Sequence, residues 1–302
     1  MGKRYTSTWK LIKLTFKEFT QDRPLDYAAI IGFYTIFSLP AVLIIMIRIA
    51  GAVFGQEAVR GEVVDQITGI VGRNSAEQIQ NIIENASLSS ASTFGTIIGL
   101  STMAFSATTV FVALQDALNA MWEVKAKIEK GWLKLVISRL LSLALVVSLG
   151  FLLMVSLSIE VILGLLNDYF QQVFSGLAVY IVVAGNQLVS LLISTVIFAA
   201  IFKVLPDANI RWPNVWIGAT VTAVLFVIGK YGINIYLQYE PLGDTYGAAG
   251  SIVLLLVWVY YTSIILLLGA EFTLVYSREK DKGIKPAEHA VKVEHHEIEK
   301  DN

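Results

Sequence analysis

The residues of this chain that could do chemistry are charged groups inside long apolar runs. Arg48, Glu160 and Lys230 each stand within such a run. An ionisable side chain inside a membrane is costly, so it usually faces the interior of a helix bundle and marks a path for ions or substrate. We expect these three residues to form a charged cluster in the outer half of the membrane. The cluster either opens as a cationic pocket for an anionic substrate or is a structural triad, with Arg48 and Lys230 reaching the outer interface.

A second set of charges stands at the opposite ends of the apolar runs, namely Asp26, Asp116, Arg139 and Glu271. Asp26 suits a helix start, where the dipole favours an acid. Asp116 and Glu271 come near the carboxyl ends of predicted helices, where the dipole opposes them, so they need cationic partners. Arg139 and Arg23 are the expected ones. The plainer interpretation is a structural ion-pair network, and the sharper one is an inner gate or protonation site.

Several classes of site are excluded by composition. The chain has no cysteine, which removes thiol catalysis, disulfides and cysteine-based metal sites. The three histidines, at 289, 295 and 296, all fall in the polar tail, so we expect neither a buried histidine triad nor a zinc site. No metal or other cofactor is expected. The 23 basic and 24 acidic residues are interspersed, and we expect no nucleic-acid partner.

The elements that must position these charges are membrane-spanning helices. Of the 302 residues, 55% are hydrophobic and 16% charged, against about 25% charged in globular domains. An apolar run of about 20 residues crosses the hydrocarbon core as a helix. We therefore predict an all-α polytopic bundle of six transmembrane helices with additional short amphipathic helices. The predicted spans cover residues 27–54, 93–114, 135–166, 177–204, 212–237 and the run from 239 to about 276.

Three regions follow from this pattern. Residues 1–26 form a basic amphipathic segment, in which Trp9, Ile12, Phe16 and Phe19 recur at helical spacing. Such a segment suits a helix on an anionic membrane surface, or simply a basic anchor that fixes topology. Residues 27–276 form the membrane domain, with an extracytoplasmic helical segment at 55–90. Residues 277–302 are charged and aperiodic, and we predict a disordered tail.

The orientation follows from the distribution of lysine and arginine. Basic residues occur before the first span, in 116–134, in 203–211 and after residue 276, whereas 55–90 is net acidic. The positive-inside rule therefore places both termini in the cytoplasm.

The last span is predicted to be the packing centre of the bundle. Helices in lipid associate where small residues let their backbones approach closely. The small residues of this run are Gly247, Ala248, Ala249, Gly250, Ser251 and Gly269.

Two stretches carry a resemblance to a known family. One is Tyr246–Ser251, followed by Leu255, Trp258, Tyr260, Tyr261 and the run 269–272; the other is Ala28-Ala29 followed by 34–40. Over about residues 5–280 the chain resembles the YihY/BrkB family. The resemblance implies a six-span protein of the bacterial plasma (inner) membrane and the handling or translocation of lipids. Family names refer to serum resistance and virulence factors, and an older label is ribonuclease BN. The resemblance to this family provides no catalytic residues to carry over to this chain.

The favoured function is a non-enzymatic transporter or lipid translocase, whose anionic lipid or small amphiphile substrate meets Arg48 and Lys230 with its headgroup. Membrane lipids are the expected partners, and a homo-oligomer is compatible with the sequence. The alternatives are a structural or envelope-integrity protein and a membrane-bound ribonuclease. The ribonuclease is disfavoured because histidines are confined to the tail.

Overall fold

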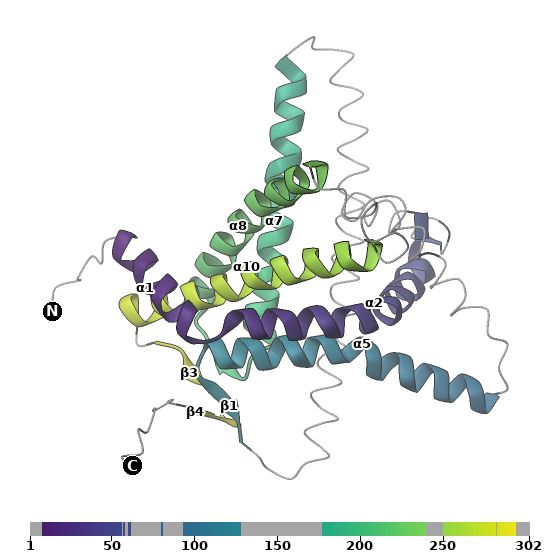
Figure 1. Ribbon diagram of the computed structural model, residues 1–302, viewed down its shortest axis with the longest axis horizontal. Coiled ribbons are helices and arrows are strands. Elements are labelled where there is room, and N and C mark those ends of the chain that lie inside the picture. The colour runs from purple at the N-terminus through teal and green to yellow at the C-terminus, as the bar shows by residue number, and fades with distance from the viewer. Residues whose placement is uncertain are drawn as a thin grey trace.

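The computed structural model describes residues 8–55, 93–127, 177–239, 250–281 and 283–293, with isolated positions at 57, 60, 61 and 80. The described part is mostly helical (Figure 1). Its helices are α1 (Thr8–Gln21), α2 (Pro24–Phe54), α5 (Thr93–Met121), α7 (Leu177–Val204), α8 (Trp212–Tyr239) and α10 (Gly250–Lys280). Its short strands are β1 (Val124–Ala126), β2 (Ala208–Asn209), β3 (Lys285–Pro286) and β4 (Ala290–Lys292).

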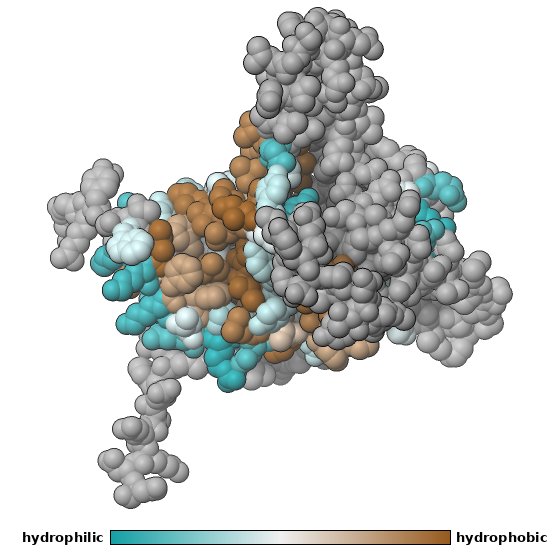
Figure 2. Space-filling view, turned by 45° about the horizontal axis from the view of Figure 1, so that its top comes forward, coloured by the Kyte–Doolittle hydropathy of each residue, from teal (hydrophilic) through white to brown (hydrophobic). Residues whose placement is uncertain are grey.

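Four of these helices are long and apolar enough to cross a membrane. The stretches are Pro24–Ile45, Gln187–Val204, Trp212–Gly232 and Ile252–Lys280. Large apolar side chains point outward from them, among them Phe37, Leu192 and Ile228, each more than 60% exposed. Figure 2 shows the resulting hydrophobic surface in brown, with many of the teal polar residues along its left and lower edge. Helices that are apolar on all sides are stable in lipid rather than water, which confirms the predicted class of helical membrane protein.

Helix α10 lies in the middle of the described bundle. It packs against α1, α2, α5 and α8, while α7 packs against the outer side of α8. The start of α2 and of α8 and the ends of α5, α7 and α10 gather at one end of the bundle (Figure 1). We call it the strap end, because residues 283–293, the C-terminal strap, fold back across it.

The contact between α8 and α10 is built on two reciprocal glycine–threonine pairs. A Cβ added at Gly269 of α10 would overlap the Thr222 hydroxyl of α8, and a Cβ added at Gly218 of α8 would overlap the Thr273 hydroxyl of α10. Each hydroxyl donates a hydrogen bond to the glycine carbonyl one turn earlier on its own helix, at 2.8 Å for Thr222 and 2.7 Å for Thr273. The polar groups are thus satisfied within a helix, and the two backbones approach closely.

Helix α1 divides its apolar residues between two faces. Leu11, Thr15 and Phe19 are buried, and α1 packs on α10. Trp9 and Phe16 remain 74% and 54% exposed. The aromatic stripe predicted from the sequence is therefore split, because Phe19 turns inward and belongs to the core.

The predicted helical class is confirmed in that the described residues are mostly helical, although they also include four short strands. The predicted disordered tail from residue 277 is wrong as far as Val293. Helix α10 continues to Lys280, after which β3 pairs antiparallel with β2 and β4 pairs antiparallel with β1. The strap is ordered because its backbone hydrogen-bonds to the segments that follow α5 and α7, a source of stability that polar composition does not reveal.

Some predictions fall outside the described residues. They are the helical segment at 55–90 apart from residue 55 and the isolated helical positions 57, 60, 61 and 80, the third span at 135–166, and the small residues 247–249.

Candidate functional site

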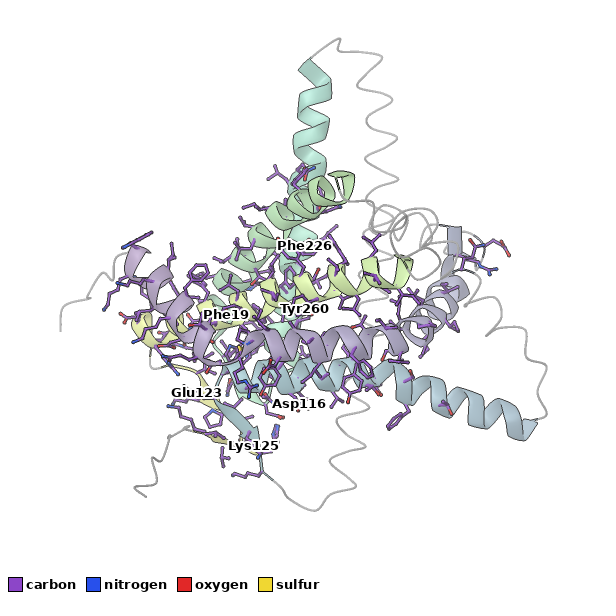
Figure 3. All side chains as sticks on the ribbon, in the orientation of Figure 1. Phe19, Asp116, Glu123, Lys125, Phe226 and Tyr260 are labelled. Carbon is purple, nitrogen blue, oxygen red and sulfur yellow. The ribbon has the colours of Figure 1, made fainter. Side chains whose placement is uncertain are left out.

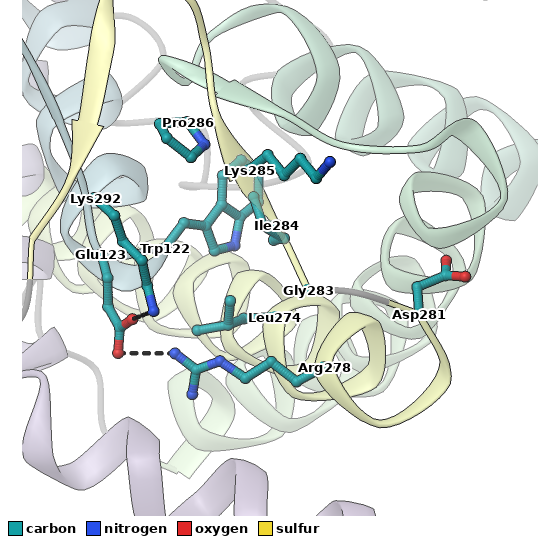
Figure 4. Close-up of a pocket in the computed structure, with 10 residues that line it drawn as sticks. All are labelled: Trp122, Glu123, Leu274, Arg278, Asp281, Gly283, Ile284, Lys285, Pro286 and Lys292. Carbon is teal, nitrogen blue, oxygen red and sulfur yellow. Dashed lines mark ion pairs between the residues drawn. The ribbon is translucent and has the colours of Figure 1, made fainter.

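Arg278, in the last turn of α10, joins three separate segments at the strap end. Its guanidinium lies 2.7 Å from the Glu18 carboxylate of α1 and 2.8 Å from the Glu123 carboxylate that follows α5. Lys292 of β4 lies 3.7 Å from the other oxygen of Glu123 (Figure 4). The side chains of Arg278, Glu18 and Glu123 are each about one-third exposed, so water screens these pairs only in part.

Two turns before Arg278 on α10 lies Glu271, which is fully buried. Neither of its carboxyl oxygens accepts a hydrogen bond from an N–H or O–H donor of the described residues. The group within hydrogen-bonding reach is the carboxyl of Asp22, in the turn between α1 and α2. Two carboxyl groups can share a hydrogen bond only when one carries a proton.

The position of Glu271 is fixed by its neighbour in sequence. The buried indole Nε1 of Trp122, at the end of α5, donates a 2.9 Å hydrogen bond to the Ala270 carbonyl. The Trp122 ring packs edge-on against Phe202 of α7, with centroids 5.9 Å apart. The acid therefore sits where α5 and α10 are held together rather than in a loose loop.

Asp22 is an acid in an unfavourable setting for a negative charge. Burial raises the pKa of Asp22 above its usual value of 3.8, and the nearby carboxylates Glu123 and Glu18 raise it further. The hydrogen bond with Glu271 and the positive charge of Arg278 oppose this rise without cancelling it. Asp22 therefore holds a proton more readily than an ordinary aspartate does.

The backbone is unusual at the two turns beside this cluster. Arg23 and Glu123 have left-handed φ values of 51° and 54°, the positive values found among non-glycine residues of the described chain. Such residues cost about 1–2 kcal/mol each, and the cost is often retained at functional sites. Here the two turns present Asp22 and Glu123 to the end of α10.

A second polar network attaches the strap. The Asn119 amide donates to the Asp207 carboxylate at 2.9 Å, and its oxygen accepts the Asp207 backbone N–H at 2.8 Å. The His289 imidazole lies 2.8 Å from the other Asp207 oxygen. Asp207 also accepts the backbone N–H of Ala287 through its carbonyl, at 3.0 Å. The end of α5, the α7–α8 connection and the strap thus meet at one buried aspartate.

A pocket of about 450 Å³ lies between the strap and the end of α10 (Figure 4). Both acidic and basic side chains line it, and Trp122 and Ile284 contribute apolar surface. Its charged lining residues are Glu123, Arg278, Asp281, Lys285 and Lys292.

The predicted inner cluster is brought together only in part. Glu271 lies at the site, but the charges acting on it come from Asp22, Glu18 and Arg278. Arg23, expected as a partner of the buried acids, instead pairs with Asp26 at 2.6 Å, and both side chains are mostly exposed. Asp116 is exposed on α5 (Figure 3). Arg139 lies outside the described residues.

The predicted outer cluster is mostly beyond what the structure describes. Lys230 is exposed on α8. Arg48 belongs to α2, but its side chain, like the whole of Glu160, is outside the described part.

Sequence reasoning missed the partners that matter most. Glu18 and Asp22 stand four residues apart, a spacing that places both on one helix face, and this signal pointed toward a shared partner. Arg278 and Lys292 fall in the region that the sequence predicts to be a disordered tail, so the sequence does not predict their contribution to the site.

The comparisons with known proteins agree with a membrane protein. A family model described as virulence factor BrkB matches residues 15–294. A UPF0761 membrane protein of Tolumonas auensis is 29% identical over 182 residues, which cover 59% of this chain and 56% of that protein. Similar proteins of the same name from Pseudoalteromonas atlantica and Vibrio parahaemolyticus are 26% and 24% identical, covering 81% and 89% of this chain and 78% and 82% of theirs. No solved structure gives a significant match.

Proposed function

The chain belongs to the virulence factor BrkB family of membrane proteins, and we propose that it is a transporter that moves an anionic lipid or small anionic amphiphile across the bilayer. The proposal keeps six spans, with the region 135–166 as one of them. It places the strap end in the cytoplasm, because Lys125, Lys203, Arg211 and Arg278 all belong to that end.

The observation that carries this proposal is the bridge that Arg278 makes between Glu18 and Glu123. It ties the end of α10 to α1 and to the turn after α5 with charge-assisted contacts that water can reach. Contacts of this kind are strong enough to hold an end closed and weak enough to be exchanged. We assign them to the inner gate of an alternating-access cycle.

The outer half of the cycle uses the predicted outer cluster. Arg48 and Lys230 would meet the anionic headgroup, while the acyl part of the amphiphile remains between the apolar helices. The exposure of Lys230 on α8 supports access to that residue from outside the described bundle.

The test is transport by the purified full chain in liposomes that contain a fluorescent anionic lipid. Movement of the lipid above the rate in protein-free liposomes is expected. Arg278→Gln should reduce the rate about tenfold, the equivalent of about 1.4 kcal/mol lost from the closed state. Arg211→Gln is the matched control, since its ion pair with Asp281 involves an arginine that is 75% exposed.

The outcomes separate the parts of the proposal. No movement of the anionic lipid by the wild type overturns the transport function. Normal transport by Arg278→Gln overturns the gate. Normal transport by both Arg48→Ala and Lys230→Ala overturns the outer site. Metal-dependent cleavage of RNA by the same preparation, lost in Asp116→Ala, would replace transport with the ribonuclease alternative.

A further inference from the structure

Glu271 is a buried ionisable group that takes no part in the ion pairs assigned to the gate. Its side chain is fully buried in the candidate span Ile252–Lys280, and both of its oxygens lack a donor among the described residues. A buried carboxylate with no donor is strongly destabilising, whereas the neutral acid costs far less. The surroundings of Glu271 therefore suit a carboxyl that carries a proton.

The neighbouring groups strengthen this point, because acids outnumber bases around Glu271. Asp22 and Glu18 face it from the α1 side, and Arg278 comes from its own helix. Glu123, after α5, acts on Asp22. Arg278 forms ion pairs with Glu18 and Glu123, and Lys292 of β4 forms an ion pair with Glu123. Arg278 and Lys292 thus pair with the carboxylates of Glu18 and Glu123. The carboxyl groups of Asp22 and Glu271 are left to interact with each other.

We propose that Asp22 and Glu271 form a proton-binding site in which one proton is shared between the two carboxyl groups and its release opens the gate at Arg278. Its role in transport rests on the proposed function, whereas the bound proton can be measured without transport. The proton leaves from Glu271 to Asp22 and from Asp22, which is only partly buried, to water at the strap end.

The link to the gate follows from helix geometry. Glu271 and Arg278 are seven residues apart on α10, so their side chains lie on the same face. While Glu271 is neutral, Arg278 is held by Glu18 and Glu123. Loss of the proton leaves a buried negative charge, and Arg278 is a described cation that acts on it. The guanidinium then has a competing partner deeper in the bundle, and the bridge to α1 and the α5 turn is weakened.

The first experiment detects the proton directly. Infrared difference spectra of the full chain in liposomes, recorded across a step from neutral to alkaline pH, should show loss of a carbonyl band of a protonated carboxylic acid. The band should be missing in Glu271→Gln and retained in Asp281→Asn, whose carboxylate is paired with Arg211 and Asn214. A band of equal size in wild type and Glu271→Gln would overturn the site.

A second measurement uses the apolar reagent dicyclohexylcarbodiimide, which adds to protonated carboxyl groups in membranes and leaves a stable N-acylurea. Peptide mass spectrometry should find the adduct at Glu271 or Asp22 and not at the ion-paired Glu123. Adduct formation should decline as the pH is raised. Modification of Glu123 with neither Glu271 nor Asp22 labelled would contradict the proposal.

The transport arm distinguishes this inference from the proposed function. An imposed pH gradient should drive the wild type at least several-fold faster than exchange without a gradient. Glu271→Gln, which resembles the permanently protonated acid, should keep the gate closed, so the exchange should fall and the response to the gradient should be lost. Wild-type transport that ignores the gradient would overturn the coupling and leave the transporter intact. A wild type that moves no lipid would overturn the transporter, while the infrared band would still report the proton.

Discussion

The hydroxyl of Thr222 on α8 occupies the place that a Cβ of Gly269 on α10 would need. The same relationship is repeated one turn away between Gly218 and Thr273, with the roles of the two helices exchanged. The α8–α10 contact is therefore fixed by close approach at these two points, and a Cβ added at Gly229 of α8 would likewise overlap the Tyr261 hydroxyl of α10.

Gly269→Ala is expected to destabilise the protein by about 1–3 kcal/mol, because the added methyl group must displace Thr222. Thermal unfolding of the detergent-solubilised chain is the measurement. Gly232→Ala on α8, where a Cβ meets no atom within 4 Å, is the matched control and should be neutral or slightly stabilising. Adding Thr222→Ala should recover part of the loss; a double variant no better than the sum of the two single changes would contradict this interpretation.

Asn119→Ala should cost about 1–3 kcal/mol, since it leaves the buried Asp207 without one side-chain donor and leaves its backbone N–H without an acceptor. Asn209→Ala, an exposed amide in the neighbouring β2, should change stability by no more than about 0.5 kcal/mol. Thermal unfolding of both variants decides the matter. Equal effects would show that the Asn119–Asp207 pair has no special weight.

The raised pKa of Asp22 predicts that the free energy of unfolding falls as the pH rises. Its folded-state pKa is raised by burial, so the folded chain holds this proton at pH values where the unfolded chain has released it. Stability from this group is therefore full below the usual value of 3.8 and is lost as the pH rises through the higher folded-state value. Asp22→Asn should flatten the pH dependence of the melting temperature and raise stability at neutral pH. Asp26→Asn, which leaves Asp22 in place, should retain the slope, and an unchanged slope in Asp22→Asn would refute the assignment.

The strap offers a test by cross-linking, because the chain has no native cysteine. Ala126 and Ala290 are paired across β1 and β4, and the flanking hydrogen bonds make theirs a closely spaced, non-hydrogen-bonded pair. Ala126→Cys with Ala290→Cys should form a disulfide on mild oxidation. Val124→Cys with Ala290→Cys, two residues out of register, should form little.

The same disulfide tests whether the strap must move for the gate to open. If the strap must shift for the strap end to open, oxidised Ala126→Cys/Ala290→Cys should lose transport and recover it on reduction. Oxidant should not change the transport rate of either single-cysteine variant. Full transport in the oxidised double variant would show that β1 and β4 remain paired throughout the cycle.

The membrane helices were predictable and the strap was not, for a physical reason. A span is encoded by local hydropathy, so α2, α7, α8 and α10 stand out in the sequence. The strap is held by backbone hydrogen bonds, such as that from the Lys127 N–H to the His289 carbonyl, and these leave no pattern in side-chain type. Its charged composition is typical of a disordered segment.

The same difference between local and long-range signals explains which residues of the candidate site could be predicted from the sequence. Glu271 was identifiable because an acid near the carboxyl end of an apolar helix is unfavourable on its own. Its neighbour Asp22 comes from the other end of the chain and resembles an ordinary turn residue. Arg23 was the expected cation, but its left-handed backbone directs it to the nearby Asp26, and the arginine that reaches the acids is Arg278.

The position of the strap in the chain has a consequence for biogenesis. Residues 283–293 leave the ribosome after every helix that they connect, so α5, α7 and α8 are synthesised before β3 and β4 exist. The partner edges at β1 and β2 must wait for the nascent chain to be almost finished. A chain that ends after α10 would therefore have all of these helices but a strap end that has never been closed by residues 283–293.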